Sequence, residues 1–236
     1  MLRLSVLALA LVLSGCDYDN LLMNQEQHAT HTENREMNKR NQSLLAAAEQ
    51  GDKEAIIRQL ADGADIDATD DRGRTSAMIA VHTKQLAVFN LLAEKGANIN
   101  IRDDRSDNPL LYAGAEGLLD FVKAAIAAKA DTKLTNRFGG TALIPAADRG
   151  HVEIVQELLE HSDVAIDHVN NLGWTALLEA VILGDGGSRH QEIVKLLIAH
   201  GANVSLADSQ GVTPLQHAKN RGYTEMVRTL SEAGAK

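Results

Sequence analysis

The chain has 236 residues, with 23 Lys+Arg against 32 Asp+Glu, a formal net charge of −9 and one cysteine. This length fits one domain or two small ones, and the acidic balance argues against a general nucleic-acid binder, which needs clustered lysine and arginine to displace counterions. A single cysteine excludes an internal disulfide, and no Cys/His set offers the four ligands of a structural zinc site. Aromatic residues are only 3% of the chain, which favours stacked helices over a β-sandwich.

The first fifteen residues have the layout of a secretory signal peptide. Arg3 supplies a positive charge, and the apolar segment from Leu4 to Leu13 is too short to span a bilayer. The segment ends in Leu13-Ser14-Gly15-Cys16, which resembles the lipobox of bacterial lipoproteins. The resemblance implies cleavage after residue 15, a diacylglycerol on the Cys16 thiol and an acylated amine at the new N-terminus. The alternative is a buried structural cysteine in a first helix.

The lipobox also implies a place in the cell. We expect a lipid anchor in the membrane of a bacterial cell envelope, with the protein facing the periplasm. Asp17 follows the lipid site directly, and in enteric bacteria an aspartate there is similar to the signal that favours the inner membrane.

Residues 16–42 comprise the lipidated cysteine and a polar tether. Only Leu21, Leu22 and Met23 form an apolar run in it. Such a segment cannot bury enough surface to offset its ordering entropy. We therefore expect it to be mostly disordered.

From residue 43 onward the sequence repeats itself. A unit that starts at Ser43 precedes five segments that align with one another. Their equivalent turn positions are spaced by 33, 33, 34 and 38 residues and are Gly73, Ser106, Gly139, Gly173 and Gly211. A fixed period of this length predicts supersecondary units that stack, because one unit cannot bury its apolar face alone.

The repeat resembles the ankyrin repeat. The motifs that carry the resemblance are Gly211-Val212-Thr213-Pro214-Leu215, Gly150-His151-Val152-Glu153-Ile154-Val155 and Gly63-Ala64-Asp65-Ile66-Asp67. The resemblance covers residues 43–236. It implies an all-α solenoid of about six stacked helix-turn-helix units, joined by β-hairpin-like loops, with a concave face that binds partners.

Three local features of the repeats lead to expectations of their own. Thr141 is placed to cap a helix that begins at Ala142. When the unit that starts at Ser43 is counted as the first, the third unit has Ser106 and Lys129 where the pattern has glycine, so its turns should be looser. The fifth has five extra residues around 184–188, which we expect to form a flexible insert between its two helices.

The candidate binding residues occupy positions that vary in this repeat family, together with the insert. Arginine and aromatic side chains are typical anchors of protein interfaces. The predicted partner-binding set is Arg72, Arg74, Arg105, Arg137, Phe138, Arg149, Trp174, Asp185 and Arg189. For Trp174, packing against the neighbouring hairpin is an equally weighted alternative.

The sequence therefore predicts a protein that recognises another protein on a rigid concave face, as a scaffold or regulator. An immunity-type inhibitor of a toxin in the periplasm is the alternative. An enzyme that uses the insert from Gly184 to His190 is a more remote one, because no nucleophile, base and acid can be assembled from spacing. We expect no cofactor, no metal site and no nucleic-acid partner, and contact with the membrane through the lipid anchor.

Overall fold

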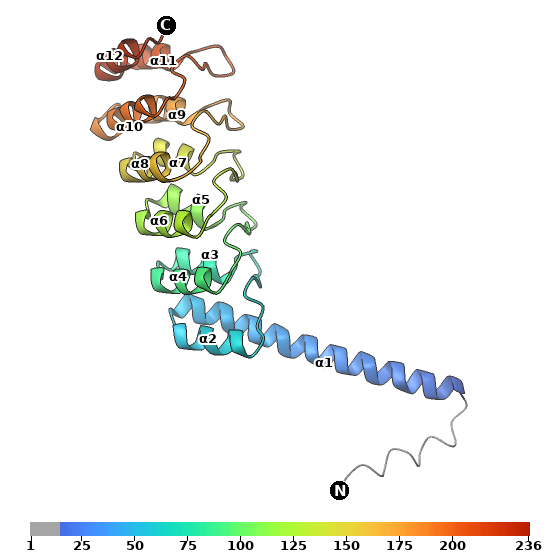
Figure 1. Cartoon of the computed structure of the whole chain (residues 1–236). Coiled ribbons are helices and arrows are strands. Elements are labelled where there is room, and N and C mark those ends of the chain that lie inside the picture. The colour runs from blue at the N-terminus through green and yellow to red at the C-terminus, as the bar shows by residue number, and fades with distance from the viewer. Residues whose placement is uncertain (1–14) are drawn as a thin grey trace.

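The computed structural model describes the backbone of residues 15–236 and the side chains from residue 30 onward. The predicted signal peptide, up to residue 14, lies outside the described residues. Six helix pairs stack in one column, and hairpin-like loops extend from one side of it (Figure 1). The helices are α1 (Gly15–Gln50), α2 (Lys53–Ala61), α3 (Ser76–His82), α4 (Leu86–Glu94), α5 (Pro109–Glu116), α6 (Leu119–Ala127), α7 (Leu143–Asp148), α8 (Val152–His161), α9 (Ala176–Ile182), α10 (Ser188–Ala199), α11 (Pro214–Arg221) and α12 (Thr224–Glu232). The expected all-α solenoid of six units is confirmed.

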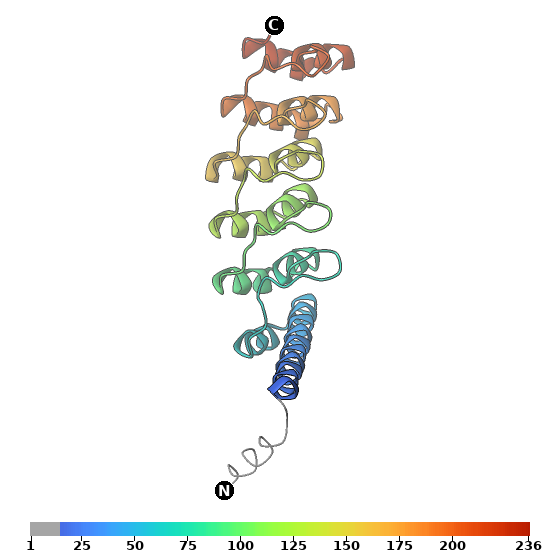
Figure 2. The ribbon, with the colours of Figure 1, turned by 90° about the vertical axis from the view of Figure 1, so that its right-hand side faces the viewer.

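The column has two layers of helices (Figure 2). Odd-numbered helices contact one another in an inner layer, and even-numbered helices form an outer layer. Alanine, leucine, isoleucine and valine fill the space between the layers, and one continuous apolar core runs from Leu44 to Leu230. The rings of Phe89 and Phe121 meet edge to face across two outer helices at 5.9 Å. Stacking buries the apolar faces that no helix pair could bury alone.

Each loop tip is built around one side chain that accepts two backbone N–H groups. The Oδ1 atom of Asn136, for example, accepts from Phe138 N at 2.9 Å and from Gly140 N at 3.1 Å. The residues that do this are Asp70, Asp103, Asn136, Asn170 and Asp208. Because Asp and Asn side chains stabilise turns in this way, the sequence determines the direction in which each tip projects.

A second series of side chains joins neighbouring repeats. Asp67 accepts from Asn98 N at 2.8 Å, and Asn100 accepts from Asp131 N at 2.9 Å. The hydrogen bond is missing at the next equivalent position, because Lys133 stands where the accepting Asp or Asn would be. There the Lys133 ammonium instead lies 3.3 Å from the Asp163 carboxylate.

The turns expected to be looser keep the geometry of the others. Ser106 and Lys129 have φ angles of 61° and 60°, in the left-handed region where the equivalent glycines lie. Asp103 still accepts from Arg105 N and Asp107 N, both at 2.9 Å. The expectation of a looser unit was wrong, because these turn hydrogen bonds and the repeat stacking outweigh a local strain of about 1–2 kcal/mol per residue.

The predicted cap at Thr141 is also corrected. Helix α7 begins at Leu143, no side chain caps it, and the Thr141 hydroxyl is buried without a hydrogen-bond partner. Thr75 and Thr175 do cap the equivalent helices α3 and α9. The difference follows from Pro145, which has no N–H to donate to Thr141 O, so Ile144 N donates there at 3.2 Å instead.

The predicted disorder of residues 17–42 was wrong, since this segment is part of helix α1. The last turns of α1 belong to the first repeat, where packing offsets the free-energy cost of nucleating the helix. Toward the N-terminus the helix continues through good helix formers such as Glu36, Met37 and Lys39. None of the helices described from residue 15 onward is both long enough and apolar enough to cross a membrane.

Two residues that the sequence analysis assigned to the tether hold the first repeat in place. Arg40 Nη1 donates to Asp62 O, and Asn41 Oδ1 accepts from Asp65 N, both at 2.8 Å. The folded unit therefore begins before Ser43. The contact of Asn41 with Asp65 continues the series that joins later repeats.

We predict that a chain beginning at Ser43 folds cooperatively but is less stable than a chain beginning at Asn38, by about 1–2 kcal/mol. The physical reason is the loss of the two hydrogen bonds made by Arg40 and Asn41. Urea denaturation of both chains, followed by circular dichroism, measures the difference. Equal stability of the two chains would contradict the assignment of these residues to the first repeat.

Candidate functional site

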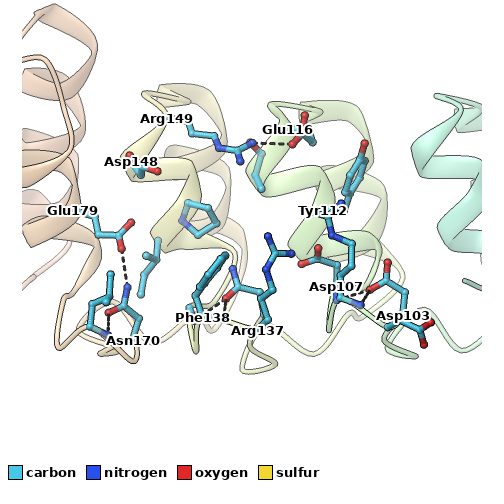
Figure 3. Close-up of a pocket in the computed structure, with 18 of the residues that line it drawn as sticks. Asp103, Asp107, Tyr112, Glu116, Arg137, Phe138, Asp148, Arg149, Asn170 and Glu179 are labelled. Carbon is cyan, nitrogen blue, oxygen red and sulfur yellow. Dashed lines mark hydrogen bonds and ion pairs between the residues drawn. The ribbon is translucent and has the colours of Figure 1, made fainter. Parts of the chain in front are cut away.

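A groove of about 750 Å³ runs along the inner helices and hairpin tips of four repeats. We call it the inner groove. It is lined by Arg72, Arg74, His82, Asp103, Asp104, Arg105, Asp107, Tyr112, Ala115, Glu116, Asn136, Arg137, Phe138, Gly140, Ile144, Pro145, Asp148, Arg149, Asn170, Leu172, Glu179 and Leu183. Figure 3 shows its central part, with the Glu179 and Asp148 carboxylates at one end and Asp107 and Tyr112 at the other.

The groove side chains come from two recurring positions. Phe138 and Leu172 lie two residues after the tip residue of their repeat, where the turn directs them outward. Tyr112, Pro145 and Glu179 occupy equivalent positions in the first turns of α5, α7 and α9 and form a row along the column. The groove is thus a consequence of stacking equivalent positions from successive repeats.

The arginines differ in how far they are already engaged. Arg149 donates to Glu116 Oε1 at 2.8 Å and to Ala115 O at 2.6 Å, and so joins two repeats. Arg74 pairs with Asp70, outside the groove lining, at 2.6 Å. Among residues 30–236, Arg72, Arg105 and Arg137 form no ion pair, so their charges remain available along the hairpin tips.

An apolar surface adjoins these charges. Phe138, Leu172 and Leu183 are 56%, 54% and 49% exposed. The Arg137 guanidinium lies 4.5 Å from the centre of the Phe138 ring, within the range of a cation–π contact. Large exposed apolar side chains beside arginine are a composition typical of protein-binding surfaces.

Carboxylates form part of the groove floor. Burial raises the pKa of Asp107 and of Asp148, and the Asp103 carboxylate adds to the effect on Asp107. Burial, together with the negative charge of Asp148, raises the pKa of Glu179 to about 7. The side chain of Glu179 is buried, and Asn170 Nδ2 donates to its Oε1 at 2.7 Å. Burial thus disfavours the negative charge of these carboxylates, and a cation placed beside them would stabilise it.

His82 and Tyr112 close the opposite end of the groove. Their rings lie 3.9 Å apart between centres, and His82 Nε2 is buried without a hydrogen-bond partner in the described part of the chain. Burial lowers the pKa of His82, and the positive charge of Arg74 acts in the same direction. The neutral imidazole is the favoured form, and it extends the ring surface of Tyr112.

Six of the predicted partner-binding residues line the inner groove: Arg72, Arg74, Arg105, Arg137, Phe138 and Arg149. Trp174, Asp185 and Arg189 are not among the lining residues. Trp174 is half-buried beside Thr175, which agrees better with its packing role than with a contact made across the groove.

The insert after α9 is held by hydrogen bonds and was wrongly expected to be flexible. Asp185 accepts from Gly187 N at 2.8 Å and contacts His190 Nδ1 at 2.9 Å. His190 Nε2 also lies 2.8 Å from Asp148 O, and Tyr223 donates its hydroxyl to Gly184 O at 2.9 Å. These contacts join the insert to the repeats on both sides.

Sequence reasoning missed several groove residues, among them Tyr112, Pro145 and Glu179. A signal for Glu179 was present, since it is the one charged residue in the apolar run from Ala176 to Leu183. In a helix that is apolar all round, a single carboxylate indicates either a buried partner or a site. No cluster of three or more metal-binding side chains occurs in the described residues.

The stacked helix pairs, hairpin tips and inner groove define a protein-interaction module of the ankyrin type. The model of the family "Ankyrin repeats (3 copies)" matches residues 9–103, 110–208 and 186–236. The chain belongs to the ankyrin repeat family. The expected repeat type is therefore confirmed.

Several relatives resemble most of the chain. The ankyrin repeat protein YahD of Escherichia coli (strain K12) is 41% identical over 191 residues, which cover 81% of this chain and 95% of YahD. An ankyrin repeat domain from Acinetobacter baumannii is 50% identical, with a TM-score of 0.79 over 82% of this chain and 98% of that one. A chain from the structure of the Bdellovibrio bacteriovorus predatory endopeptidase Bd0816 in complex with immunity protein Bd3460 is 25% identical, with a TM-score of 0.67 over 80% of this chain and 97% of that one.

We predict that Glu179→Gln removes a pH-dependent loss of stability. The pKa of Glu179 rises from 4.5 to about 7 on folding, so the folded chain retains a proton that the unfolded chain releases. The free energy of unfolding therefore falls as the pH rises through this interval, by at most about 3 kcal/mol. Glutamine keeps an oxygen acceptor for Asn170 without this titration.

Urea denaturation at about pH 5 and about pH 8 tests this prediction. Glu153→Gln is the matched control, because it makes the same change on the exposed face of α8 and should keep the original pH dependence. An unaltered pH dependence in Glu179→Gln would show that this carboxyl does not titrate as predicted.

Proposed function

We propose that the chain is a lipid-anchored protein of a bacterial envelope that binds another protein in the inner groove, without catalysis, as a scaffold or regulator. The observation that carries the proposal is the exposed apolar surface of Phe138, Leu172 and Leu183 beside arginines that form no ion pair. Desolvated aromatic and arginine anchors of this kind commonly dominate binding energy.

The proposed anchor rests on the sequence Leu13-Ser14-Gly15-Cys16. An acyl chain contributes about 0.8 kcal/mol for each buried methylene, and several chains together give stable attachment. Asp17 supports the inner membrane as the location. The groove would then face the periplasm, on the same side as its partner.

We predict that Cys16→Ala blocks labelling by radioactive fatty acid and prevents normal processing, because the variant has no thiol to receive the lipid. Labelling and membrane fractionation of the variant and the unaltered chain, expressed in the same bacterial host, measure both effects. A variant that is still processed and still membrane-bound would remove the lipoprotein assignment.

For the groove, we predict that Phe138→Ala weakens binding of the partner roughly thirtyfold, which corresponds to about 2 kcal/mol. Crosslinking and affinity capture of the anchored chain from its own host, followed by mass spectrometry, identifies the partner. The affinity of each purified variant for it is then measured.

Trp174→Ala is the informative comparison, since Trp174 lies outside the groove lining. This variant should melt at a lower temperature and keep its affinity while folded. If Phe138→Ala is folded and binds with unchanged affinity, the inner groove is not the binding site.

Inhibition of a toxin enzyme that reaches the periplasm is a second candidate function. It is favoured by the similarity to a chain from the complex of an endopeptidase with an immunity protein. The two candidates differ in the captured partner. An inhibitor captures an enzyme whose activity falls when one equivalent of this chain is added, whereas a scaffold leaves the activity of its partner unchanged.

A further inference from the structure

Two carboxylates that line the inner groove, Glu179 and Asp148, form no ion pair with the described residues. Glu179 is 7% exposed, and of its two oxygens only Oε1 accepts a hydrogen bond, from Asn170. Asp148 is only half-buried, and its side chain lines the groove. The two groups come from neighbouring inner helices and repel each other, which raises the pKa of Glu179 further. A carboxylate as deeply buried as that of Glu179 is costly in its charged form unless a cation or donor reaches it.

No cationic side chain of the described residues pairs with Glu179 or Asp148. Arg149 binds Glu116 and Ala115 O in the preceding repeat. Arg137 lies over the Phe138 ring. His190 contacts the Asp185 carboxylate and the backbone carbonyl of Asp148, and it forms no ion pair with the Asp148 carboxylate. The described residues thus supply no counter-charge within ion-pair distance of Glu179 and Asp148.

The walls beside these carboxylates are apolar. Leu172 N donates to the Asn170 side chain that also binds Glu179, and Leu183 lies one helical turn after Glu179 on the same face. Figure 3 shows Phe138 on the hairpin side of the groove, and Phe138 O accepts from Asn171 N of the next hairpin tip at 3.0 Å. All three apolar side chains are about half exposed. A ligand must therefore combine a cationic head with an apolar stem.

We infer that this end of the inner groove, the Glu179 end, receives a lysine or arginine side chain of the protein partner. The cationic head lies between the Glu179 and Asp148 carboxylates, and the methylene stem packs against Phe138, Leu172 and Leu183. Lysine and arginine bury their stems along apolar surface in this way, and charged hydrogen bonds to carboxylate are among the strongest that proteins make. This inference rests on the proposed function, since it specifies what the groove recognises.

An NMR titration of the full chain in detergent tests the inference. The probe is the acetylated, amidated tripeptide Leu-Arg-Leu, and the comparison is the same peptide with citrulline, a neutral isostere of arginine. The side-chain amide of Asn170 is the reporter, because it donates directly to Glu179. We expect the arginine peptide to shift this signal saturably and to bind at least about tenfold more tightly than the citrulline peptide, with an affinity that falls as salt is added.

Variants complete the test. Glu179→Gln and Asp148→Asn should each weaken binding of the arginine peptide at least about tenfold. Glu153→Gln, on the exposed face of α8, should leave that affinity unchanged. Equal binding of the two peptides, no binding of either, or full binding by Glu179→Gln overturns the inference.

The partner-capture experiment separates this inference from the proposed function. If Phe138→Ala loses the partner while Glu179→Gln and Asp148→Asn still bind it, the groove remains the binding site and the inference of a bound lysine or arginine is wrong. A partner that is kept on Phe138→Ala removes the groove itself, whatever the peptides do.

Discussion

The structure depends on one interaction that recurs in every aligned repeat, in which an aspartate or asparagine side chain accepts two backbone N–H groups at the hairpin tip. Without this acceptor, the backbone N–H groups would bond to water instead, and the tip could adopt other turn conformations. With it, the residue two positions later projects outward in each repeat. Arg72, Arg105, Phe138 and Leu172 all lie at this position and all line the inner groove. The binding surface is therefore built from turns whose geometry is fixed locally.

The sequence predicted the features that depend on position within a repeat. The spacing of the turn glycines is enough to define helix pairs and their stacking, and equivalent positions of the pairs identified six groove residues. It did not predict how far the groove extends along the column. Arg74 and Asp107 line the groove, whereas Trp174, which occupies the equivalent position in a later repeat, does not. The last inner helix that contributes to the lining is α9. That limit is set by three-dimensional packing of several repeats.

The remaining misses have one physical source, which is that context beyond the repeat outweighs local preference. Residues 17–42 have the composition of a disordered tether, but they continue a helix that the first repeat has already nucleated. Thr141 has a side chain suited to capping, but it does not cap α7 because Pro145, four residues later, has no N–H to donate. The pKa of Glu179 is raised to about 7 by burial between stacked repeats and, in addition, by the Asp148 carboxylate of the preceding repeat. Residue composition alone does not reveal these effects, because each depends on how a segment folds with its neighbours.

Helix α1 has a geometric consequence for a protein attached to a membrane at Cys16. A helix rises 1.5 Å per residue, so residues 16–42 form a rod about 40 Å long, whereas a flexible coil of the same number of residues has a root-mean-square span of about 30 Å and samples all shorter distances as well. The rod works as a lever arm of fixed radius. With the proposed lipid on Cys16, the rod would keep the first repeat at nearly the same distance from the anchor at every tilt, so the groove would meet partners on a shell of roughly fixed radius around that point.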